Sequence, residues 1–277
     1  MTENFAVGEY LRNLKLPFCP GCGIFTIMNT FLKAVHELGH ENLRKFVFCS
    51  GIGCSSWISS PYFVADSIHT PHGRSIPVAT GIKLLRPSVN VVVFGGDGDI
   101  VGIGMSHFIH AARRNLDVLV VMVNNMVYGM TGGQVAPTTP FKTKTTTTPY
   151  GSFEHPLDAQ RLAVAAGACY SARWTTTHLD ELKESIKKGL QMKGFRFIEV
   201  VSQCPTAYGR RAGFKNVGEM LKWFKEKAVS IVQAEKMSEK ELEGRIVIGE
   251  FVEKKRPTIV ETVYTMIKEA QVNAGEN

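Results

Sequence analysis

Four short runs of β-branched, aromatic and other apolar residues are the feature that most limits how this 277-residue chain can fold. They span residues 46–49, 89–94, 118–123 and 195–201, and each is followed at once by Gly, Asn or Ser. Near-continuous apolar runs of strand length are typical of strands that are buried on both faces. The four runs therefore predict strands of a parallel sheet that is covered on both sides.

Helical patterns lie between and beside the predicted strands. Apolar residues recur at helical spacing over residues 24–38, 76–85, 102–113, 157–166 and 179–192. Alternation of strands and helices predicts an α/β fold with a doubly wound, mostly parallel sheet. Ligands of such sheets bind at the carboxyl ends of the strands, so the residues that directly follow each apolar run are the candidates for a site.

Two regions fall outside this alternation. Residues 128–155 form a long stretch rich in Thr, Pro and Gly, and we interpret a loop of this length after a buried strand as functional. The chain becomes more charged after Pro205, and one amphipathic helix is predicted at residues 217–227. We expect residues 216–277 to form a helical tail that contacts another subunit.

Composition and charge argue against several classes of protein. No signal peptide is visible and no run approaches the roughly 20 apolar residues of a membrane helix, so we expect a cytoplasmic protein without a membrane partner. The net charge of +7 comes from scattered Lys and Arg, which argues against a nucleic-acid partner and is compatible with an acidic protein partner. Six cysteines in a cytoplasmic protein indicate metal binding, redox chemistry or burial rather than disulfides.

Polar motifs follow two consecutive predicted strands. The strand at 89–94 runs into Gly95-Gly96-Asp97-Gly98-Asp99, and the strand at 118–123 runs into Asn124-Asn125. Asp97 and Asn125 lie close together if the two strands are neighbours. Their oxygens suit Mg²⁺, which often shares its shell with a diphosphate, and the glycines let backbone N–H groups approach that anion. A lone Gly-Asp-Gly is a common turn, but the paired motifs are the constellation that a thiamine diphosphate enzyme requires.

Four cysteines lie in turns or at predicted strand ends. They are Cys19 and Cys22 of a Cys-Pro-Gly-Cys turn, Cys54 after the first strand and Cys204 after the last. Four thiolates suit an iron–sulfur cluster or zinc, and a C-x-x-C pair can also be a redox dithiol, so spacing alone leaves all three open. The thiamine diphosphate site favours the cluster, because that cofactor's chemistry yields electrons for a nearby acceptor. Cys49 and Cys169 are predicted to be buried packing residues.

These motifs, in this order, resemble those of 2-oxoacid:ferredoxin oxidoreductase β subunits. The matching motifs are CPGCG, GIGCS, HTPHGR, GGDGD, VNNMVYGMTGGQ and SQCPT, between about residue 13 and residue 223. MTGGQVAPTTP, TTPYG and SQCPTAYGRR look most like the 2-oxoglutarate branch. The resemblance implies oxidative decarboxylation of a 2-oxoacid, 2-oxoglutarate in the first place, to acyl-CoA and CO₂. The electrons pass through a [4Fe–4S] cluster to ferredoxin.

The resemblance also implies roles for individual residues. Cys19, Cys22, Cys54 and Cys204 match the cluster ligands, and Asp97, Asn125 and the carbonyl of Val127 match the Mg²⁺ ligands. The positions that match contacts to thiamine diphosphate are Ile52, Gly53, Cys54, Ser55, His72, Gly96, Asp97, Gly98, Asp99, Asn125, Gly129 and Met130. His72 matches a catalytic histidine beside the cofactor. Residues 1–215 are then the thiamine-diphosphate-binding domain, with a cluster-binding segment at its N-terminal end.

The sequence also departs from the family pattern. No glutamate matches the acid that activates the aminopyrimidine ring; in the family this acid comes from the partner chain, so an α subunit is expected, with or without further small subunits. Trp57 and Gly132 stand where relatives that accept several 2-oxoacids carry lysine, and Asn124 replaces a frequent Asp. Two alternatives stay open: the same chemistry on pyruvate or branched-chain 2-oxoacids, and a non-catalytic α/β subunit with zinc at the cysteines.

Overall fold

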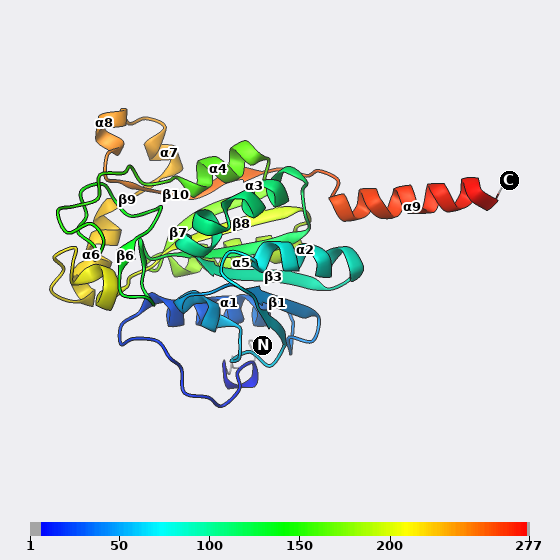
Figure 1. Ribbon diagram of the computed structural model, residues 1–277, viewed down its shortest axis with the longest axis horizontal. Coiled ribbons are helices and arrows are strands. Elements are labelled where there is room, and N and C mark those ends of the chain that lie inside the picture. The colour runs from blue at the N-terminus through cyan, green and yellow to red at the C-terminus, as the bar shows by residue number, and fades with distance from the viewer. Residues whose placement is uncertain (1–6, 276–277) are drawn as a thin grey trace.

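The central element of the computed structural model, which describes residues 7–275, is an eight-stranded sheet (Figure 1). Its strand order is β2-β1-β3-β4-β8-β7-β10-β9. The strands are β1 (Phe46–Ser50), β2 (Asp66–His69), β3 (Asn90–Gly96), β4 (Val118–Asn124), β7 (Tyr170–Thr175), β8 (Phe195–Val201), β9 (Ala228–Ser230) and β10 (Ile246–Glu253). From β2 to β7 every pair is parallel, whereas β10 runs antiparallel to β7 and parallel to β9. The predicted mostly parallel sheet is confirmed.

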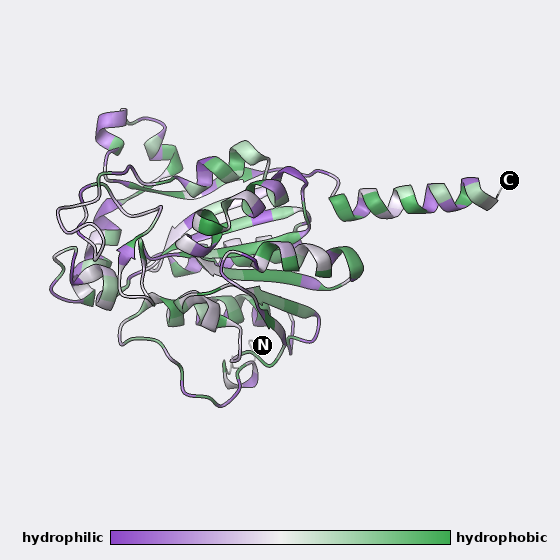
Figure 2. Ribbon diagram, viewed as in Figure 1, coloured by the Kyte–Doolittle hydropathy of each residue, from purple (hydrophilic) through white to green (hydrophobic). Residues whose placement is uncertain are grey.

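The four strands predicted from apolar runs are neighbours at the centre of this sheet. Every residue of β4 and of β8 is buried, because helices cover both faces. Along β4 the side chains alternate between two hydrophobic clusters: Leu119, Val121 and Val123 join one, and Val118, Val120 and Met122 join the other. Figure 2 shows this hydrophobic centre beneath helices whose outer surfaces are more polar.

Helices pack on both faces of the sheet, as a doubly wound fold requires. One face is covered by α1 (Gly23–Glu37) and α5 (Leu179–Gln191), which contribute Phe31 and Leu182 to the first cluster. The other face is covered by α2 (Ser75–Leu85), α3 (Met105–Arg113) and α4 (Ala159–Ala166). All five agree with the predicted helices to within a few residues at each end.

Shorter elements lie at the ends of the main strands and helices. They are the helical turns η1 (Val7–Glu9), η2 (Cys54–Ile58), η3 (Gly98–Ile103) and η4 (Pro205–Gly209), and the two-stranded ribbon of β5 (Val127–Tyr128) and β6 (Gln134–Val135). Three of the turns directly follow β1, β3 and β8 with little intervening chain. At the carboxyl ends of β1, β3 and β8 the chain therefore forms tight turns, whereas β4 is followed by the long stretch of residues 128–155.

The expectation of a purely helical tail after residue 215 was wrong in one respect. The segment contains α6 (Val217–Lys227), α7 (Ile231–Ala234), α8 (Glu239–Leu242) and α9 (Ile259–Gly275), but also β9 and β10, which extend the main sheet. The pattern of β10 was missed because it carries Glu250 and Glu253, whose carboxylates pair with Lys188 at the surface. Residues 217–227 form a helix with the predicted bounds.

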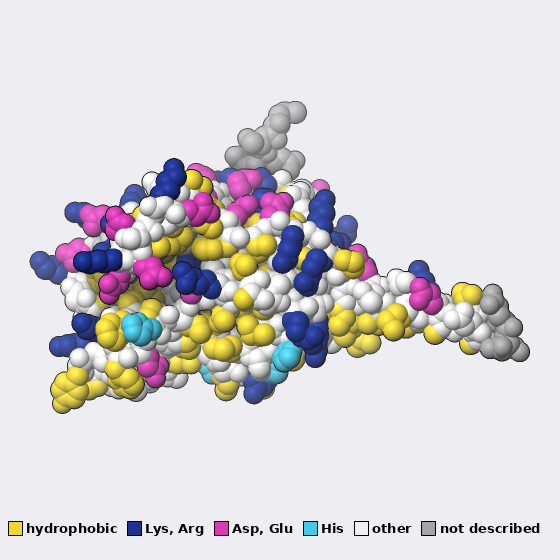
Figure 3. All heavy atoms as spheres, turned by 90° about the horizontal axis from the view of Figure 1, so that it is seen from above, with side chains coloured by type: hydrophobic (Ala, Val, Ile, Leu, Met, Phe, Trp, Pro, Cys, Tyr) yellow, Lys and Arg dark blue, Asp and Glu magenta, His cyan; other side chains and the backbone are white. Residues whose placement is uncertain are grey.

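The last helix, α9, projects from the body at the end opposite to α6 (Figure 1). Figure 3 shows hydrophobic side chains continuing from the body along this helix. Its large exposed apolar residues are Tyr264, Met266, Ile267 and Val272. Within residues 7–275, no helix combines the length and the apolar character that crossing a bilayer would need.

Candidate functional site

The turn after β3 carries two buried carboxylates. Asp97 and Asp99 are 1% and 2% exposed, and η3 begins between them at Gly98. A side chain at position 98 would overlap the ring of Tyr128, so only glycine fits there. The predicted Gly-Asp-Gly-Asp motif thus forms a tight turn at the carboxyl edge of the sheet.

Asp99 ties this turn to two neighbouring loops. Its Oδ1 accepts hydrogen bonds from the backbone N–H of Gly73 at 2.7 Å and of Ile52 at 3.3 Å. The same oxygen lies 2.6 Å from Nδ1 of His72. Because this contact engages Nδ1, the imidazole presents Nε2 as the nitrogen available to a ligand. Asp99 therefore orients the histidine that was predicted to stand beside the cofactor.

The two asparagines after β4 have different surroundings. Asn124 donates to Glu199 at 2.8 Å and accepts from the backbone N–H of Met126 at 3.2 Å, so it belongs to the buried network beneath the strand end. Asn125 instead lines a cavity together with Asp97. The strands β3 and β4 are direct neighbours, with Gly96 opposite Val123, which brings the two motifs to one edge.

This first cavity collects the predicted diphosphate and Mg²⁺ residues. It is lined by Ile52, Gly53, Cys54, Ser55, His72, Gly96, Asp97, Gly98, Asp99, Asn125, Val127, Tyr128, Gly129, Met130 and Thr131. Every residue predicted to contact thiamine diphosphate or Mg²⁺ is among them. Tyr128 and Thr131 are additions that sequence reasoning missed; both lie in or beside the quoted VNNMVYGMTGGQ motif.

The long loop after β4 folds back onto this cavity. Thr138 donates a hydrogen bond to Oδ2 of Asp97, and Thr139 donates to the carbonyl of Met126 at 2.7 Å. Both threonines are buried. A residue of the stretch 128–155 thus contacts a predicted metal ligand, which supports the interpretation of this stretch as functional. Thr138 itself was missed, because nothing in a run of threonines marks which one turns inward.

The electrostatics around Asp97 suit a cation. Burial raises the pKa of Asp97 to about 7, although Thr138 and the backbone N–H of Gly98 act in the opposite direction. No Lys, Arg or His among residues 7–275 forms an ion pair with this carboxylate. A buried carboxylate without a basic partner, beside an amide oxygen and a backbone carbonyl, is the oxygen-rich set that Mg²⁺ prefers.

A second cavity collects the four predicted cluster ligands. Its lining includes Cys19, Cys22, Cys54 and Cys204, together with Trp57, Asn125, Gly129 and Met130. The Cys-Pro-Gly-Cys turn is closed by a 3.0 Å bond from the N–H of Cys22 to the carbonyl of Cys19. The N–H of Gly23 bonds to the carbonyl of Gln203 at 3.1 Å, which fixes this turn beside the end of β8.

The thiols of this cavity influence one another. Burial raises the pKa of Cys22 to about 12, and the Cys204, Cys54 and Cys19 thiols add to the increase. Burial likewise raises the pKa of Cys54 to about 11, with contributions from Cys204 and Cys19. Cys49 and Cys169 are fully buried and line neither cavity, as predicted.

The four cysteines line one cavity together. Within the part of the chain that the structure describes, no three His, Cys, Asp or Glu side chains are arranged to hold a single metal ion. Tetrahedral zinc needs its thiolates within about 2.3 Å of one centre. A multi-atom cluster needs them spread around a larger volume, and four cysteines are a donor set that both clusters and structural zinc use.

The two cavities share a wall. Cys54, Asn125, Gly129 and Met130 line both. A Cβ on Gly129 would be 3.5 Å from Nδ2 of Asn125 and 3.6 Å from Sγ of Cys204, so these two atoms are no more than 7.1 Å apart. A predicted Mg²⁺ ligand and a predicted cluster ligand therefore lie close to each other in space, both beside Gly129.

Two of the three positions that depart from the family pattern are Gly132 and Trp57, where some relatives carry lysine. Gly132 has φ +120° and Gly133 has φ +89°, conformations that residues with side chains rarely adopt. A lysine at position 132 would need a different backbone path. Trp57 lies in η2, lines the cysteine cavity and packs edge-on against His69.

Comparison with protein families matches the part of the chain that contains the first cavity to a known type of cofactor-binding domain. Residues 51–200 match the family model of the thiamine pyrophosphate enzyme C-terminal TPP-binding domain. This range includes the first cavity, from Ile52 to Thr131, and Cys54 of the second. The α/β fold with an eight-stranded, mostly parallel sheet is thus of the thiamine-diphosphate-binding type.

Full-length relatives extend the similarity to nearly the whole chain. The chain is 52% identical to the 2-oxoglutarate synthase subunit KorB of Methanocaldococcus jannaschii, over 94% of this chain and 96% of the relative. It is 40% identical to subunit beta of 2-oxoacid:ferredoxin oxidoreductase 2 of Aeropyrum pernix, over 82% of this chain and 70% of the relative.

A solved structure agrees in fold. A chain of the 2-oxoglutarate:ferredoxin oxidoreductase from Magnetococcus marinus, with 2-oxoglutarate, coenzyme A and succinyl-CoA bound, superposes with a TM-score of 0.85. Sequence identity is 32%, and the match covers 97% of this chain and 92% of that chain. The chain, which is 52% identical to a 2-oxoglutarate synthase subunit KorB, therefore belongs to the family of 2-oxoacid:ferredoxin oxidoreductase β subunits.

Proposed function

We propose that this chain is the β subunit of a 2-oxoglutarate:ferredoxin oxidoreductase that converts 2-oxoglutarate and coenzyme A to succinyl-CoA and CO₂. The observation that carries the proposal is the shared wall between the two cavities. One cavity presents the residues for Mg²⁺ and a diphosphate, the other presents four cysteines, and Gly129 is close to both Asn125 and Cys204. Two-electron oxidation of an organic substrate next to an iron–sulfur acceptor needs this proximity.

The residues of the first cavity would hold thiamine diphosphate through its charged end. Asp97, Asn125 and the carbonyl of Val127 would coordinate Mg²⁺. The turns at 52–55 and 96–99 and the segment at 129–130 would bring backbone N–H groups to the diphosphate. When bound, thiamine diphosphate supplies the electron sink for decarboxylation, and a [4Fe–4S] cluster on Cys19, Cys22, Cys54 and Cys204 supplies the acceptor.

His72 is the proposed catalytic residue of this chain. Asp99 holds its Nδ1 at 2.6 Å, which fixes the ring in the cavity wall with Nε2 available for a hydrogen bond or a proton. The ring of Tyr128 packs edge-on against it at 6.1 Å between centroids and limits its rotation. The histidine is thus held in one orientation by residues of this chain.

The chain is proposed to need a partner for activity. The ionisable side chains that line the first cavity are Cys54, His72, Asp97, Asp99 and Tyr128, and no glutamate is among them. The acid that activates the aminopyrimidine would then come from an α subunit, which places the active site at a subunit interface. Residues 1–215 carry both cavities, and residues 216–277, α9 above all, would serve subunit contact. The six unbridged cysteines suit a reducing cytoplasm.

Turnover of the complex with its α subunit tests this function. The purified complex is assayed under anaerobic conditions with coenzyme A, ferredoxin and a panel of 2-oxoglutarate, pyruvate and branched-chain 2-oxoacids. We expect the highest kcat/KM with 2-oxoglutarate and no turnover by this chain alone. Preference for pyruvate or branched-chain substrates would contradict the substrate assignment. Absence of turnover with every substrate would contradict the proposal that the complex is a 2-oxoacid oxidoreductase.

A further inference from the structure

The excess positive charge of the chain is concentrated around the cysteine cavity. Segments 11–22 and 204–227 carry Cys19, Cys22 and Cys204. Together they contain eight Lys or Arg and two Glu, a net of +6, when the whole chain has a net charge of +7. The basic residues are Arg12, Lys15, Arg210, Arg211, Lys215, Lys222, Lys225 and Lys227. The two segments, which are far apart in the sequence, meet where Val217 lines a pocket with Cys19 and Cys22.

Most of these charges face solvent without a carboxylate partner. Exposed side chains include Lys15, Arg210, Arg211, Lys215, Lys222 and Lys225. Among the described residues only Lys222 of this set forms an ion pair, with Glu226 at 3.7 Å. The lysines of α5 differ, because Lys187 pairs with Glu37 and Glu184 at the surface. The cysteine end of the molecule therefore carries a group of positive charges that are mostly unpaired.

The helix α6 brings part of this charge directly beside the cysteine turn. Its first residue, Val217, lines an open pocket with Cys19 and Cys22, and a Cβ on Gly21 would overlap it. Lys215 precedes Val217 by two residues, and Lys222 follows it by five, which is about 7.5 Å along a helix axis. Lys215 thus stands near the mouth of the cavity, whereas Lys222 lies about 140° around the helix axis from Val217, on the solvent side of α6.

The mouth of the cavity itself is exposed and partly apolar. Cys19 is exposed, and Phe25 on the first turn of α1 is 42% exposed in the same pocket. The cysteine site therefore opens to the surface through an apolar centre with a basic rim. We call this surface, formed by residues 15–25 and 205–227, the basic face.

We propose that the basic face is the docking site for the acidic electron-carrier protein, a ferredoxin, that takes electrons from the cluster. The proposal rests on the proposed function. Opposite charge accelerates encounter and aligns the partners, and weak redox complexes bury little surface, so a small apolar centre with a charged rim suffices. In each encounter one electron passes from the reduced cluster to the oxidised centre of the carrier, with no bond formed or broken.

Charge reversal on the basic face tests the proposal. The complex with the α subunit is prepared as wild type, as the double variant Lys215→Glu/Lys222→Glu and as the control Lys254→Glu/Lys255→Glu. The control lysines are exposed and follow β10, whose last residue pairs with the first residue of β7, at the sheet edge opposite to the cysteines. Each is assayed with 2-oxoglutarate and coenzyme A, using either an acidic [4Fe–4S] ferredoxin or a small neutral dye as the acceptor.

We expect the double variant to raise the KM for ferredoxin about tenfold at low ionic strength, an effect that shrinks as salt screens the charges. Dye reduction, the KM for coenzyme A and the control variant should match the wild type. An unchanged KM for ferredoxin would overturn the proposal. Loss of the α subunit, or a change confined to coenzyme A, would also overturn it by assigning the face to another occupant. Failure of the wild type to reduce the dye would instead contradict the proposed function.

Discussion

Asn125 and Cys204 both lie beside Gly129, with Nδ2 of the first and Sγ of the second 3.5 Å and 3.6 Å from its Cβ position and so no more than 7.1 Å apart. The two residues come from the ends of β4 and β8, which are adjacent parallel strands. Adjacent carboxyl ends thus join an oxygen-rich pocket to a thiol-lined one. The proposed enzyme depends on this contact between two otherwise separate sites.

Removal of the Asp97 carboxylate should release the cofactor but not the cluster. In Asp97→Ala the proposed Mg²⁺ site loses its only charged side-chain ligand, so we expect retention of Mg²⁺ and thiamine diphosphate to fall at least about tenfold. Iron content should stay at the wild-type level. Thiamine diphosphate and iron are measured in the anaerobically purified complex, with the exposed Asp66→Ala as the control. Undiminished thiamine diphosphate in Asp97→Ala would refute the ligand assignment.

Replacement of His72 should slow turnover while the cofactor stays bound. His72→Gln keeps a polar group in the cavity wall but cannot transfer a proton, so kcat should fall about 100-fold. His155→Gln, on the exposed part of the long loop, serves as the control and should have wild-type kcat. Turnover and thiamine diphosphate content are measured on the same samples. A His72→Gln enzyme with normal kcat would show that this histidine has no catalytic role.

Variants of the cavity-lining cysteines and of the buried packing cysteines should differ in iron content. Cys204→Ser removes a proposed cluster ligand, and we expect loss of iron, sulfide and the brown colour of the protein. Cys49→Ala removes a buried thiol that lines neither cavity and should retain all three, with a modest loss of stability from the smaller side chain. Iron and sulfide are assayed after anaerobic purification. Equal iron in both variants would contradict the assignment.

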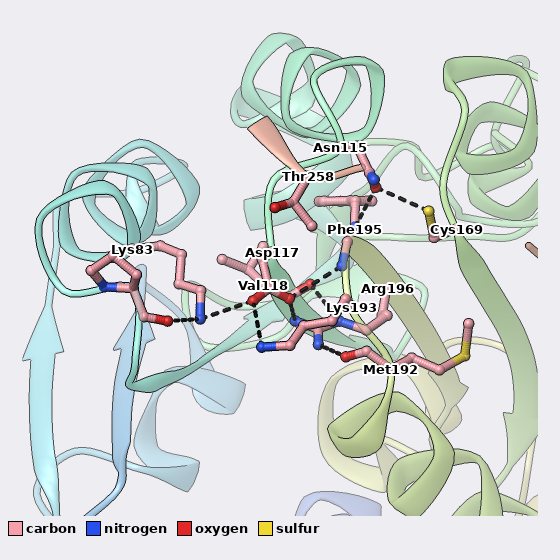
Figure 4. A network of polar contacts seen from close by, with 12 residues as sticks. Lys83, Asn115, Asp117, Val118, Cys169, Met192, Lys193, Phe195, Arg196 and Thr258 are labelled. Atoms are coloured by element: carbon pink, nitrogen blue, oxygen red, sulfur yellow. Dashed lines mark hydrogen bonds and ion pairs between the residues drawn. The ribbon is translucent and has the colours of Figure 1, made fainter. Parts of the chain in front are cut away.

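A buried ion-pair network at the opposite edge of the sheet predicts a pH-dependent loss of stability. Asp117 contacts Lys83 at 2.9 Å and Arg196 at 3.1 Å, and all three side chains are nearly inaccessible to solvent (Figure 4). Burial acts to raise the pKa of Asp117, but Arg196 and Lys83 outweigh it and hold the pKa below its usual range. Asp117→Asn leaves two buried cations without their carboxylate and should lower the free energy of unfolding by about 3 kcal/mol at pH 7.

The sign of the pH effect follows from the lowered pKa. A carboxyl group whose pKa is depressed by folding stabilises the folded state above its unfolded pKa of about 3.9 and loses that contribution as the pH falls through the folded value. The stability difference between wild type and Asp117→Asn should therefore be constant from pH 7 to pH 5 and shrink below about pH 4. Denaturation of both proteins, with the exposed Asp180→Asn as control, measures it. A difference that grows on acidification would contradict this account.

The central strands could be predicted from sequence because strands that are buried on both faces consist almost entirely of apolar residues. Strands β1, β3, β4 and β8 are covered on both faces and consist of apolar runs that few other structures tolerate. The outer strands contain no such apolar runs. Strand β2 reads Asp-Ser-Ile-His at an exposed sheet edge. Strand β7 interrupts its apolar residues with Ser171 and with Arg173, whose guanidinium pairs with the buried carboxylate of Glu199. Their pairing was visible only in three dimensions.

The candidate site divides in the same way. Residues with special backbone or ligand chemistry, such as Gly98, Asp97 and Cys22, stand in short motifs and could be found from sequence. Thr138 could not, because its role depends on how a 28-residue stretch folds back to reach Asp97. The basic face was also hidden, since it is assembled from segments nearly 200 residues apart that meet only where α6 packs beside the cysteine turn.

Electron paramagnetic resonance of the anaerobic complex tests most directly whether the two cavities work as one site. The complex of this chain with its α subunit is mixed with 2-oxoglutarate and coenzyme A without ferredoxin, then frozen and compared with a sample without substrate. We predict that substrate produces the paramagnetic signal of a reduced [4Fe–4S] cluster, and that Cys204→Ser abolishes it. A complex that contains stoichiometric zinc in place of iron, or a cluster that stays oxidised while 2-oxoglutarate is consumed, would contradict the account.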